Sequence, residues 1–321
     1  MSLYQKGAFL IKGLREFTIN GYLSAAKSFN SQDLEKDITG NVYMITGANS
    51  GLGKSAAIAL ARKGGEIHMV CRNEERGNAA KNEIVEESSN SNVHLHILDM
   101  SHPKDVYAFA NKFLQDHNIL NVLVNNSGCM VNERVITSDE LETNFATNTL
   151  GTYILTQQLL PLLKQSDKPR VITVSSGGMY TQKLNVQDMQ MLQLQKFEGE
   201  MVYAQNKRQQ VILTEEWAKQ ESAVHFSCMH PGWADTPAVR TSMPGFYDAM
   251  KNKLRTSEQG ADTIVWLAMA DAALAKPSGK FFLDRKPTNT HLALAWTRES
   301  ARDRAQFLQN LAELAEKFKP A

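Results

Sequence analysis

The chain has 321 residues, 42% of them hydrophobic, so it can bury a large core without needing a second domain. Its 35 Lys and Arg residues nearly balance its 34 Asp and Glu residues, and a formal net charge of +1 gives no support for nucleic-acid binding. Its three cysteines, Cys71, Cys129 and Cys228, are widely spaced and form no C-x-x-C pair, which argues against a disulfide framework and for a reducing compartment such as the cytoplasm.

Residues 1–39 precede the expected domain and interleave apolar with basic side chains. The longest apolar run, Gly7 to Ile11, is too short for a transmembrane helix or for the core of a signal peptide. We expect an amphipathic helix that packs on the domain. The alternative that stays open is peripheral contact with a membrane or a lipid droplet.

Strands and helices are predicted to alternate over residues 40–290. This alternation predicts an α/β fold: a single-domain, doubly wound (Rossmann-type) parallel β-sheet with helices on both faces, whose ligands bind at the carboxyl ends of the strands. In the tail, residues 291–321, Phe307, Leu311 and Leu314 have helical spacing, so we expect a packing helix there. The expected strands cover residues 42–45, 67–70, 93–98, 122–125, 171–174, 224–229 and 281–283.

A glycine-rich turn, residues 46–53, follows the first expected strand and precedes an apolar helical run. Gly47 allows the tight turn, Gly51 lets the backbone approach a pyrophosphate, and Gly53 allows close packing of the helix. The free N–H groups at the start of the helix attract phosphates. The alternative is a glycine-rich turn without a ligand. The predicted dinucleotide contacts in this turn are Gly47, Asn49, Ser50, Gly51, Leu52 and Gly53.

Tyr203 and Lys207 are four residues apart in an expected helix, which places the phenol and the ammonium on one face. A phenol ionises near pH ~10, and a fixed positive charge nearby pulls its pKa towards neutral pH. The pair therefore suits a catalytic acid. Alone, the same spacing also describes a solvated pair of surface neighbours.

The order of these motifs resembles the short-chain dehydrogenase/reductase family, in its classical form, over roughly residues 40–290. T-G-x-x-x-G-x-G is followed about 150 residues later by Y-x-x-x-K, and four further motifs of the family stand between or after them. These are Asn125-Asn126-Ser127-Gly128 for the family's N-N-A-G, Asn148, the pair Ser175-Ser176, and Pro231-Gly232-Trp233-Ala234-Asp235-Thr236 for P-G-x-x-x-T.

The resemblance implies hydride transfer between C4 of a nicotinamide and a carbonyl or alcohol carbon. Tyr203 would then deliver the proton, Ser176 would hydrogen-bond the same oxygen, and Lys207 would hold the ribose hydroxyls. Asn148 would hold a water that links Lys207 to solvent. The alternatives are that Ser176 is a turn serine and Asn148 a packing residue bonded to backbone. Further cofactor contacts implied by the motifs are Asn125, Tyr203, Lys207, Pro231, Gly232, Trp233 and Thr236.

The end of the second expected strand favours NADP(H) over NAD(H). NAD enzymes usually carry an acid at this place, whereas this chain has Cys71-Arg72-Asn73. No carboxylate there repels a 2′-phosphate, and the fork of Arg72 can bond one. Asp99 matches the adenine contact of the family. Alternatively, Arg72 faces solvent, and Asp99 or Ser101 caps the next helix.

The segment between Ser176 and Tyr203 is long for the family and rich in methionine and aromatic residues. Flexible thioethers suit a broad apolar wall, so we predict substrate contacts by Ser176, Tyr203, Met130, Met179 and Trp233. The substrate expected from them is a small lipophilic carbonyl or alcohol, such as a retinoid, steroid or lipid aldehyde. The alternative is a segment that packs only on its own surface.

Other functions receive less support. His94 and His96 lie on one face of a strand, but no third ligand is evident, so no metal site is predicted. A dinucleotide-binding protein with a regulatory or scaffold role stays as the alternative function, although the intact Tyr203 and Lys207 speak against it. A homo-oligomer through the helices after Asn148 and around Tyr203 also stays open.

Overall fold

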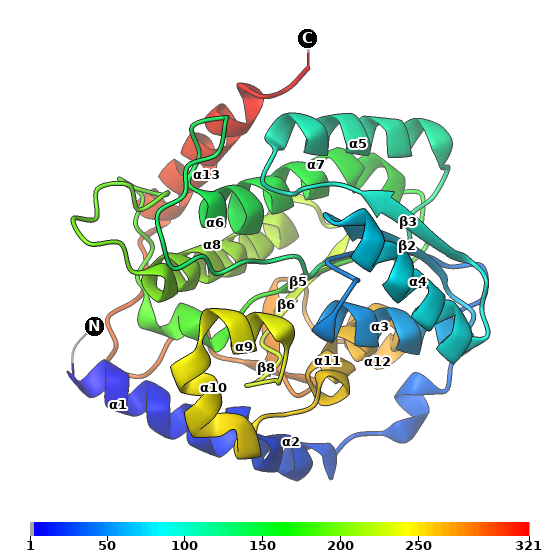
Figure 1. Ribbon diagram of the computed structural model, residues 1–321, viewed down its shortest axis with the longest axis horizontal. Coiled ribbons are helices and arrows are strands. Elements are labelled where there is room, and N and C mark those ends of the chain that lie inside the picture. The colour runs from blue at the N-terminus through cyan, green and yellow to red at the C-terminus, as the bar shows by residue number, and fades with distance from the viewer. Residues whose placement is uncertain (1–2, 321) are drawn as a thin grey trace.

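The computed structural model describes residues 3–320, and one eight-stranded sheet forms its centre, with the strand order β3-β2-β1-β4-β5-β6-β7-β8 (Figure 1). The first seven strands are parallel and β8 runs antiparallel to β7. All seven predicted strands are confirmed. The sequence did not predict β8, because its three residues carry no apolar pattern. The strands are β1 Val42–Thr46, β2 Glu66–Cys71, β3 Val93–Ile97, β4 Val122–Asn125, β5 Arg170–Val174, β6 His225–Met229, β7 Lys280–Leu283 and β8 Lys286–Thr288.

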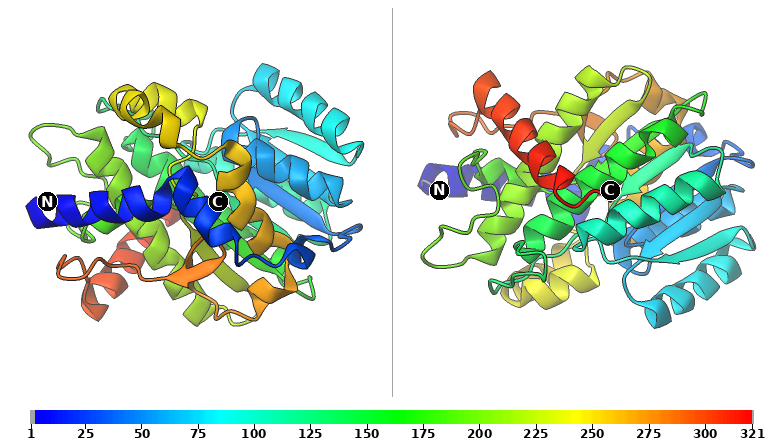
Figure 2. Two further views of the ribbon diagram at one scale, coloured as in Figure 1. Left: turned by 90° about the horizontal axis from the view of Figure 1, so that it is seen from below. Right: turned by 90° about the horizontal axis from the view of Figure 1, so that it is seen from above.

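Helices cover both faces of the sheet, so the doubly wound fold is confirmed (Figure 2). One face carries α3 (Gly51–Arg62), α4 (Glu74–Ser88), α11 (Ser257–Met269) and α12 (Asp271–Leu274), and the other carries α5 (Pro103–Asp116), α7 (Thr152–Leu163) and α8 (Gly199–Gln220). Strand side chains alternate between the two cores: Met44 of β1 joins the core under α5, α7 and α8, whereas Ile45 joins the core under α3 and α11.

The strand order reverses between β1 and β4, which are neighbours in the sheet. Connections leave β1 towards β2 on one side and leave β4 towards β5 on the other, so a crevice opens at the carboxyl ends of these strands. The glycine-rich turn follows β1, and the Asn125-Asn126 motif ends β4. The fold thus brings both motifs to the place where such sheets bind ligands.

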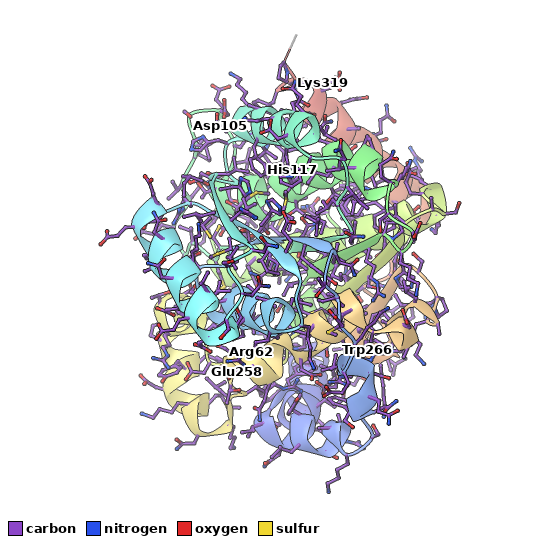
Figure 3. The ribbon with its side chains drawn as sticks, turned by 90° about the vertical axis from the view of Figure 1, so that its right-hand side faces the viewer. Arg62, Asp105, His117, Glu258, Trp266 and Lys319 are labelled. Atoms are coloured by element: carbon purple, nitrogen blue, oxygen red, sulfur yellow. The ribbon has the colours of Figure 1, made fainter. Side chains whose placement is uncertain are left out.

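The N-terminal segment packs on the domain through one face. It forms α1 (Leu3–Lys12), a π-helical turn (Gly13–Phe17), α2 (Ile19–Ala26) and a 3-10 turn (Ser31–Leu34). Phe17 is fully buried, and its carbonyl accepts from Trp233 N at 2.7 Å. Trp266 of α11 donates through Nε1 to Asp33 Oδ2 at 2.7 Å and ties the end of the segment to the domain (Figure 3). The opposite face exposes Tyr4, Leu10, Ile11, Leu14 and Leu23.

The C-terminal helix α13 (Ala301–Glu316) packs across α5 and α8. Phe307 and Leu311 are fully buried, and Tyr107 Oη of α5 donates to Ala315 O at 3.2 Å. The expected packing helix is therefore present. It shares one core with α7 and α8, the helices through which we expected an oligomer, and so covers part of their apolar surface. Within the described residues, no helix is long and apolar enough to cross a membrane.

His230, which follows β6, makes the stability of the fold depend on pH. Its side chain is buried, packs edge-on against Phe17 at 4.3 Å, and has no hydrogen-bond partner among the described residues at either ring nitrogen. Burial, and then the charges of Arg255 and Lys12, hold the pKa of His230 well below 6.5. Below pH 6.5 the unfolded chain binds a proton there that the folded protein does not, so folding stability falls as the pH falls.

We therefore expect the free energy of unfolding of the protein to fall more steeply below pH 6.5 than that of His230→Phe, by up to about 1.4 kcal/mol per pH unit. The phenyl ring keeps the packing on Phe17 but does not titrate. Urea unfolding at pH 7.5, 6.0 and 5.0 measures both slopes. Identical slopes would show that His230 is not buried in its neutral form.

Candidate active site

The glycine-rich turn forms a cradle at the amino end of α3. Gly47 and Gly51 have φ of +67° and +51°, left-handed values that favour glycine. A Cβ on Gly53 would lie 2.5 Å from the carbonyl oxygen of Gly47, so only glycine allows this approach of helix and strand. Ser50 is the N-cap of α3, and its side chain makes no capping bond. Its hydroxyl and the first N–H groups of α3 therefore suit a phosphate.

The other residues predicted to contact a cofactor at the turn differ in which of their atoms can reach it. Asn49 precedes Ser50 in the turn. The side chain of Leu52 packs against Gly260 of α11, because a Cβ added to Gly260 would lie 2.5 Å from Leu52 Cδ2. Leu52 can therefore contribute only its backbone. Thr236 lies beside the turn, because a Cβ on Gly51 would meet its Cγ2 at 3.3 Å.

Asn126, not Asn125, holds the glycine-rich turn. Asn126 Nδ2 donates to Thr46 O at 2.9 Å and to Gly47 O at 3.3 Å. Asn125 lies deeper, is 2% exposed, and donates through Nδ2 to Thr156 Oγ1 at 2.9 Å. The side chain of Asn125 thus lies behind the turn, and its cofactor contact stays a prediction.

Arg72 extends into solvent at the carboxyl end of β2. Its side chain is 67% exposed, and its Nη1 lies 3.7 Å from Asp99 Oδ2, too far for a hydrogen bond. Asp99 Oδ1 accepts from Ser101 N and Oγ at 2.9 and 2.8 Å. The alternative that Asp99 or Ser101 caps the next helix is wrong, because the N-cap of α5 is His102. Arg72 is consequently free to turn towards an anion.

Tyr203, Lys207 and Ser176 come together at the carboxyl end of β5. The two α8 residues share one face, with Lys207 Nζ 5.2 Å from the ring centroid of Tyr203. Ser176 follows β5 and hydrogen-bonds the hydroxyl of Tyr203. Lys207 Nζ donates to Val174 O at 2.9 Å, which anchors the ammonium to the end of the strand. The alternative of a solvated surface pair does not hold, because Lys207 is 2% exposed.

Asn148 completes this group from a π-helical turn, Ala146–Gly151, before α7. A Cβ on Gly128 would meet Asn148 Oδ1 at 3.2 Å and Lys207 Nζ at 3.4 Å, so both groups lie around this glycine. Asn148 Nδ2 donates to the backbone carbonyl of Cys129 at 2.8 Å. The backbone carbonyl of Asn148 accepts from Gln210 Nε2 at 2.7 Å. Asn148 thus joins the loop after β4 to α8.

Burial controls the titration of the central pair. It raises the pKa of Tyr203 to about 12, although the hydrogen bond with Ser176 acts in the opposite direction. It lowers the pKa of Lys207 to about 8. The expectation that Lys207 brings the pKa of Tyr203 towards neutral pH is therefore wrong for this arrangement, because the loss of water on burial has the largest effect on that pKa. At neutral pH the phenol keeps its proton and can donate it.

The predicted substrate residues do not all reach the site. Met179 is fully buried in a cluster with Phe17, Tyr180 and Cys228, so its predicted place on a substrate wall is corrected to a place in the core. Met130 is half-buried in the loop after β4.

Trp233, predicted to contact both cofactor and substrate, packs against neighbouring aromatic rings. Its ring lies against Phe17 at 5.7 Å and against Phe246 of α10 (Pro244–Met250) at 5.2 Å. It therefore joins the N-terminal segment to α10. Its neighbour Gly232 has φ +76°, which turns the chain there, and Pro231 is half-buried.

Sequence reasoning missed the polar row that supports Asn148. Six consecutive polar side chains of α8, Gln205 to Gln210, are buried. Gln209 accepts from Thr149 Oγ1 at 2.7 Å and donates to Met189 O at 2.9 Å, so it fixes the π-helical turn and the long segment before α8. The signal was available, because an unbroken polar run beside a catalytic motif on a central helix must find partners.

Comparisons with known proteins show the family to which the chain belongs. The family model described as short chain dehydrogenase matches residues 41–245. Dehydrogenase/reductase SDR family member 12 of Bos taurus is 56% identical over 99% of this chain and 100% of its own length, and the protein of the same name of Homo sapiens is 54% identical over the same shares. Retinol dehydrogenase 12 of Bos taurus is 36% identical over 78% of this chain and 79% of its own length.

Solved structures share the fold. One from Mycobacterium paratuberculosis has a TM-score of 0.69 and 25% identity, covering 89% of this chain and 97% of its own. One from Shigella flexneri, described as a short chain dehydrogenase complexed with NADP, has a TM-score of 0.62 and 23% identity, covering 78% of this chain and 99% of its own.

Proposed function

The chain belongs to the short-chain dehydrogenase family, and from that premise we propose that it is an NADP(H)-dependent oxidoreductase acting on the carbonyl or alcohol group of a lipophilic substrate. The observation that carries this proposal is the meeting of Ser176, Tyr203, Lys207 and Asn148 beside the cradle of Gly47 to Gly53. A dinucleotide-binding regulatory protein needs only the cradle.

The residues divide the work of carbonyl reduction. A nicotinamide bound in the cradle would supply a hydride to the substrate carbon, and negative charge would then develop on the substrate oxygen. Tyr203 and Ser176 place two hydroxyls where that charge develops, and Tyr203 gives up its proton to the new alcohol. Lys207 is cationic below its pKa of about 8 and stabilises the phenolate that Tyr203 leaves behind. Asn148 would hold a water that links Lys207 to solvent, and the proton that returns to Tyr203 would pass through this water.

Arg72 is proposed to recognise the 2′-phosphate of NADP(H), because its side chain is 67% exposed and its contact with Asp99, at 3.7 Å, is too long for a hydrogen bond. We expect Arg72→Ala to raise the KM for NADPH about 10- to 100-fold and to leave the KM for NADH within twofold, since a charge-assisted bidentate bond contributes about 1.5–3 kcal/mol. Initial rates measured with NADPH and with NADH give the KM for each cofactor and the ratio of the two KM values. Arg302→Ala, which removes an exposed arginine from α13, is the control. Equal losses with both cofactors would refute the assignment.

A lipophilic substrate is supported by the relatives and by half-buried apolar residues near the site. Retinol dehydrogenase 12 is named for a lipophilic alcohol. Met130 lies in the loop after β4, and Met243, Phe246 and Tyr247 of the α9–α10 region are half-buried (α9 is Pro237–Ser242). These side chains suit an apolar partner. Tyr203 and Ser176 remain the proposed contacts with its polar end.

Peripheral membrane contact is proposed for the outer face of the N-terminal segment. Tyr4 Oη donates to Ala293 O at 3.1 Å, which brings α1 beside a loop whose Leu294 and Trp296 are 71% and 86% exposed. Ile11 of α1 is 70% exposed. Exposed tryptophan and aliphatic side chains beside basic residues favour a lipid interface.

We expect the purified protein to co-sediment with vesicles of phosphatidylcholine and phosphatidylserine, and the double variant Ile11→Ser/Trp296→Ser to lose at least half of that binding. The bound fraction is measured after centrifugation. Ile97→Ser, which changes an exposed apolar residue on the edge strand β3, serves as the control. If the protein itself does not sediment with the vesicles, the proposed membrane contact is wrong.

A further inference from the structure

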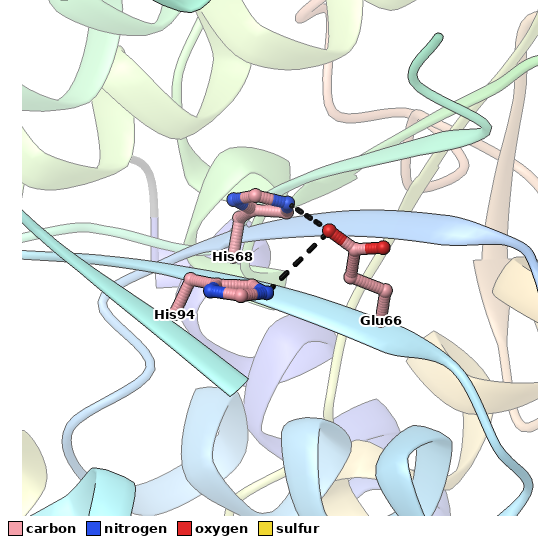
Figure 4. Close-up of side chains that lie close together, drawn as sticks. All are labelled: Glu66, His68 and His94. Carbon is pink, nitrogen blue, oxygen red and sulfur yellow. Dashed lines mark hydrogen bonds and ion pairs between the residues drawn. The ribbon is translucent and has the colours of Figure 1, made fainter. Parts of the chain in front are cut away.

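A cluster of histidines lies at the opposite end of the sheet from the active site. Glu66 begins β2, His68 lies two residues later on the same face, and the register pairs His68 with His94 of β3. The three side chains point to one another (Figure 4), and His68 packs edge-on against Phe113 of α5 at 5.0 Å. The sequence argument found no third ligand beside His94 and His96, whereas the structure brings Glu66 and His68 of the neighbouring strand next to His94.

The ligand atoms of this cluster lie close enough together for small side-chain movements to bring them onto one small cation. Glu66 Oε1 lies 3.0 Å from His68 Nε2 and 3.5 Å from His94 Nε2, and all three ligand atoms lie within 4.8 Å of one another. Tetrahedral bonds of about 2.0–2.1 Å separate two ligands by about 3.4 Å. The 3.5 Å separation of Glu66 Oε1 and His94 Nε2 matches this value, whereas the 3.0 Å contact of Glu66 Oε1 with His68 Nε2 is a hydrogen bond that must lengthen. The rings of His68 and His94 stack at 4.8 Å and must turn so that both Nε2 atoms face the metal.

His96 and His117 support the cluster from behind. His68 Nδ1 lies 2.9 Å from His96 Nε2, and the two rings stack at 5.1 Å. His117, at the end of α5, packs edge-on against His68 at 4.7 Å and stacks on Phe113 (Figure 3). With a metal on Nε2, His68 would donate its Nδ1–H to His96. Such an outer hydrogen bond fixes the tautomer and the ring plane of a metal-binding histidine.

Access and chemistry both suit a metal. His68 is fixed in the interior, whereas the side chains of His94 and Glu66 are 45% and 31% exposed and leave the cluster open to solvent. We propose that Glu66, His68 and His94 bind one divalent transition metal of the Zn²⁺ type, with water at the fourth position. Two imidazoles and one carboxylate are typical ligands of Zn²⁺ and Co²⁺ and poor ligands of Mg²⁺.

The place of the site indicates its role. Glu66 and His94 stand at the amino ends of their strands, whereas the cradle and Tyr203 stand at the carboxyl ends. The metal would thus take no part in hydride transfer. It would join β3, the edge strand of the sheet, to β2 and stabilise that edge.

Tag-free protein, freed of metal with a chelator, tests the site by titration with Co²⁺ and Zn²⁺. We expect one equivalent of Co²⁺ to give the intense visible absorption of four-coordinate cobalt, and Zn²⁺ to abolish it and to raise the unfolding temperature. His94→Ala should weaken Zn²⁺ binding at least 10-fold. Glu66→Gln, which keeps the side-chain shape, should also weaken Zn²⁺ binding at least 10-fold. It replaces His94→Ala in the test if that variant folds poorly. His102→Ala, outside the cluster, should bind like the parent protein.

Two outcomes would overturn the proposal. One is that the parent protein gives no absorption and no calorimetric heat with either metal. The other is that His94→Ala and Glu66→Gln, both folded by circular dichroism, bind Zn²⁺ as tightly as the parent protein. NADPH binding measured on the same samples keeps this test separate from the proposed enzyme activity.

Discussion

Tyr203→Phe is expected to lower the turnover number for carbonyl reduction about 10²- to 10⁴-fold while leaving the Kd for NADPH within twofold. The phenyl ring keeps its packing above Lys207, but the hydroxyl that bonds Ser176 and donates the proton is gone. Initial rates of NADPH oxidation give the turnover number, and fluorescence titration gives the Kd. Both are measured on the same preparation.

Tyr153→Phe is the matched control for this substitution. Tyr153 is a half-buried tyrosine of α7 that stacks on Trp217 at 6.3 Å, away from Tyr203. Its variant should keep the parent turnover number. A Tyr203→Phe enzyme that reduces carbonyls at the parent rate would remove Tyr203 from the mechanism. A variant that no longer binds NADPH would show that Tyr203 acts on the cofactor site instead.

Arg255→Leu is expected to lower the free energy of unfolding by about 3–5 kcal/mol, because it leaves a buried carboxylate without its partner. Arg255 is 1% exposed, and its Nη1 and Nη2 bond the two oxygens of Asp284 at 2.5 and 2.9 Å. The same guanidinium also donates to the carbonyls of Glu16 and Phe17, at 2.6 and 3.0 Å. The substitution therefore also releases the N-terminal segment from the domain.

Urea unfolding measures this loss, and limited proteolysis reports the release of residues near Phe17. Removing both charges, in Arg255→Leu/Asp284→Leu, should restore part of the stability, since no unpaired carboxylate is then buried. Arg62→Leu breaks an exposed ion pair with Glu87 and should cost at most about 1 kcal/mol. If Arg255→Leu also lowered the free energy of unfolding by no more than about 1 kcal/mol, the result would contradict a buried ion pair.

Much of the candidate active site was predictable because the motifs lie at the ends of parallel strands. The order of strands and helices fixes which ends meet, so Ser176 after β5 and the cradle after β1 had to lie on one edge of the sheet. The spacing of Tyr203 and Lys207 then selects one face of α8. These relations need only local pattern and topology.

The sequence could not reveal what depends on register and burial. Asn125 is the last residue of β4 and Asn126 follows it, so their side chains point in different directions. Only the structure shows that Asn126 faces the glycine-rich turn. The segment containing Met179 read as a flexible apolar wall, but Phe17, from far along the chain, covers it. The pairing of His68 with His94 follows from the register of β2 and β3, which no motif encodes.

The pKa of Tyr203 shows the same limit. The neighbouring ammonium was visible in the sequence and predicted a lowered pKa. The structure adds burial, which raises the pKa to about 12. Position along a helix gives the neighbour of a side chain, whereas its loss of water depends on every element packed around it.

Transfer of deuterium tests the central claim most directly. The protein is incubated with NADPH that carries deuterium at C4 of the nicotinamide and with a panel of lipophilic aldehydes and ketones, and the products are analysed by mass spectrometry. The account predicts an alcohol with one deuterium on its carbinol carbon, formed by the protein and not by Tyr203→Phe. NADPH binding without deuterium in any product would contradict it and favour the regulatory alternative.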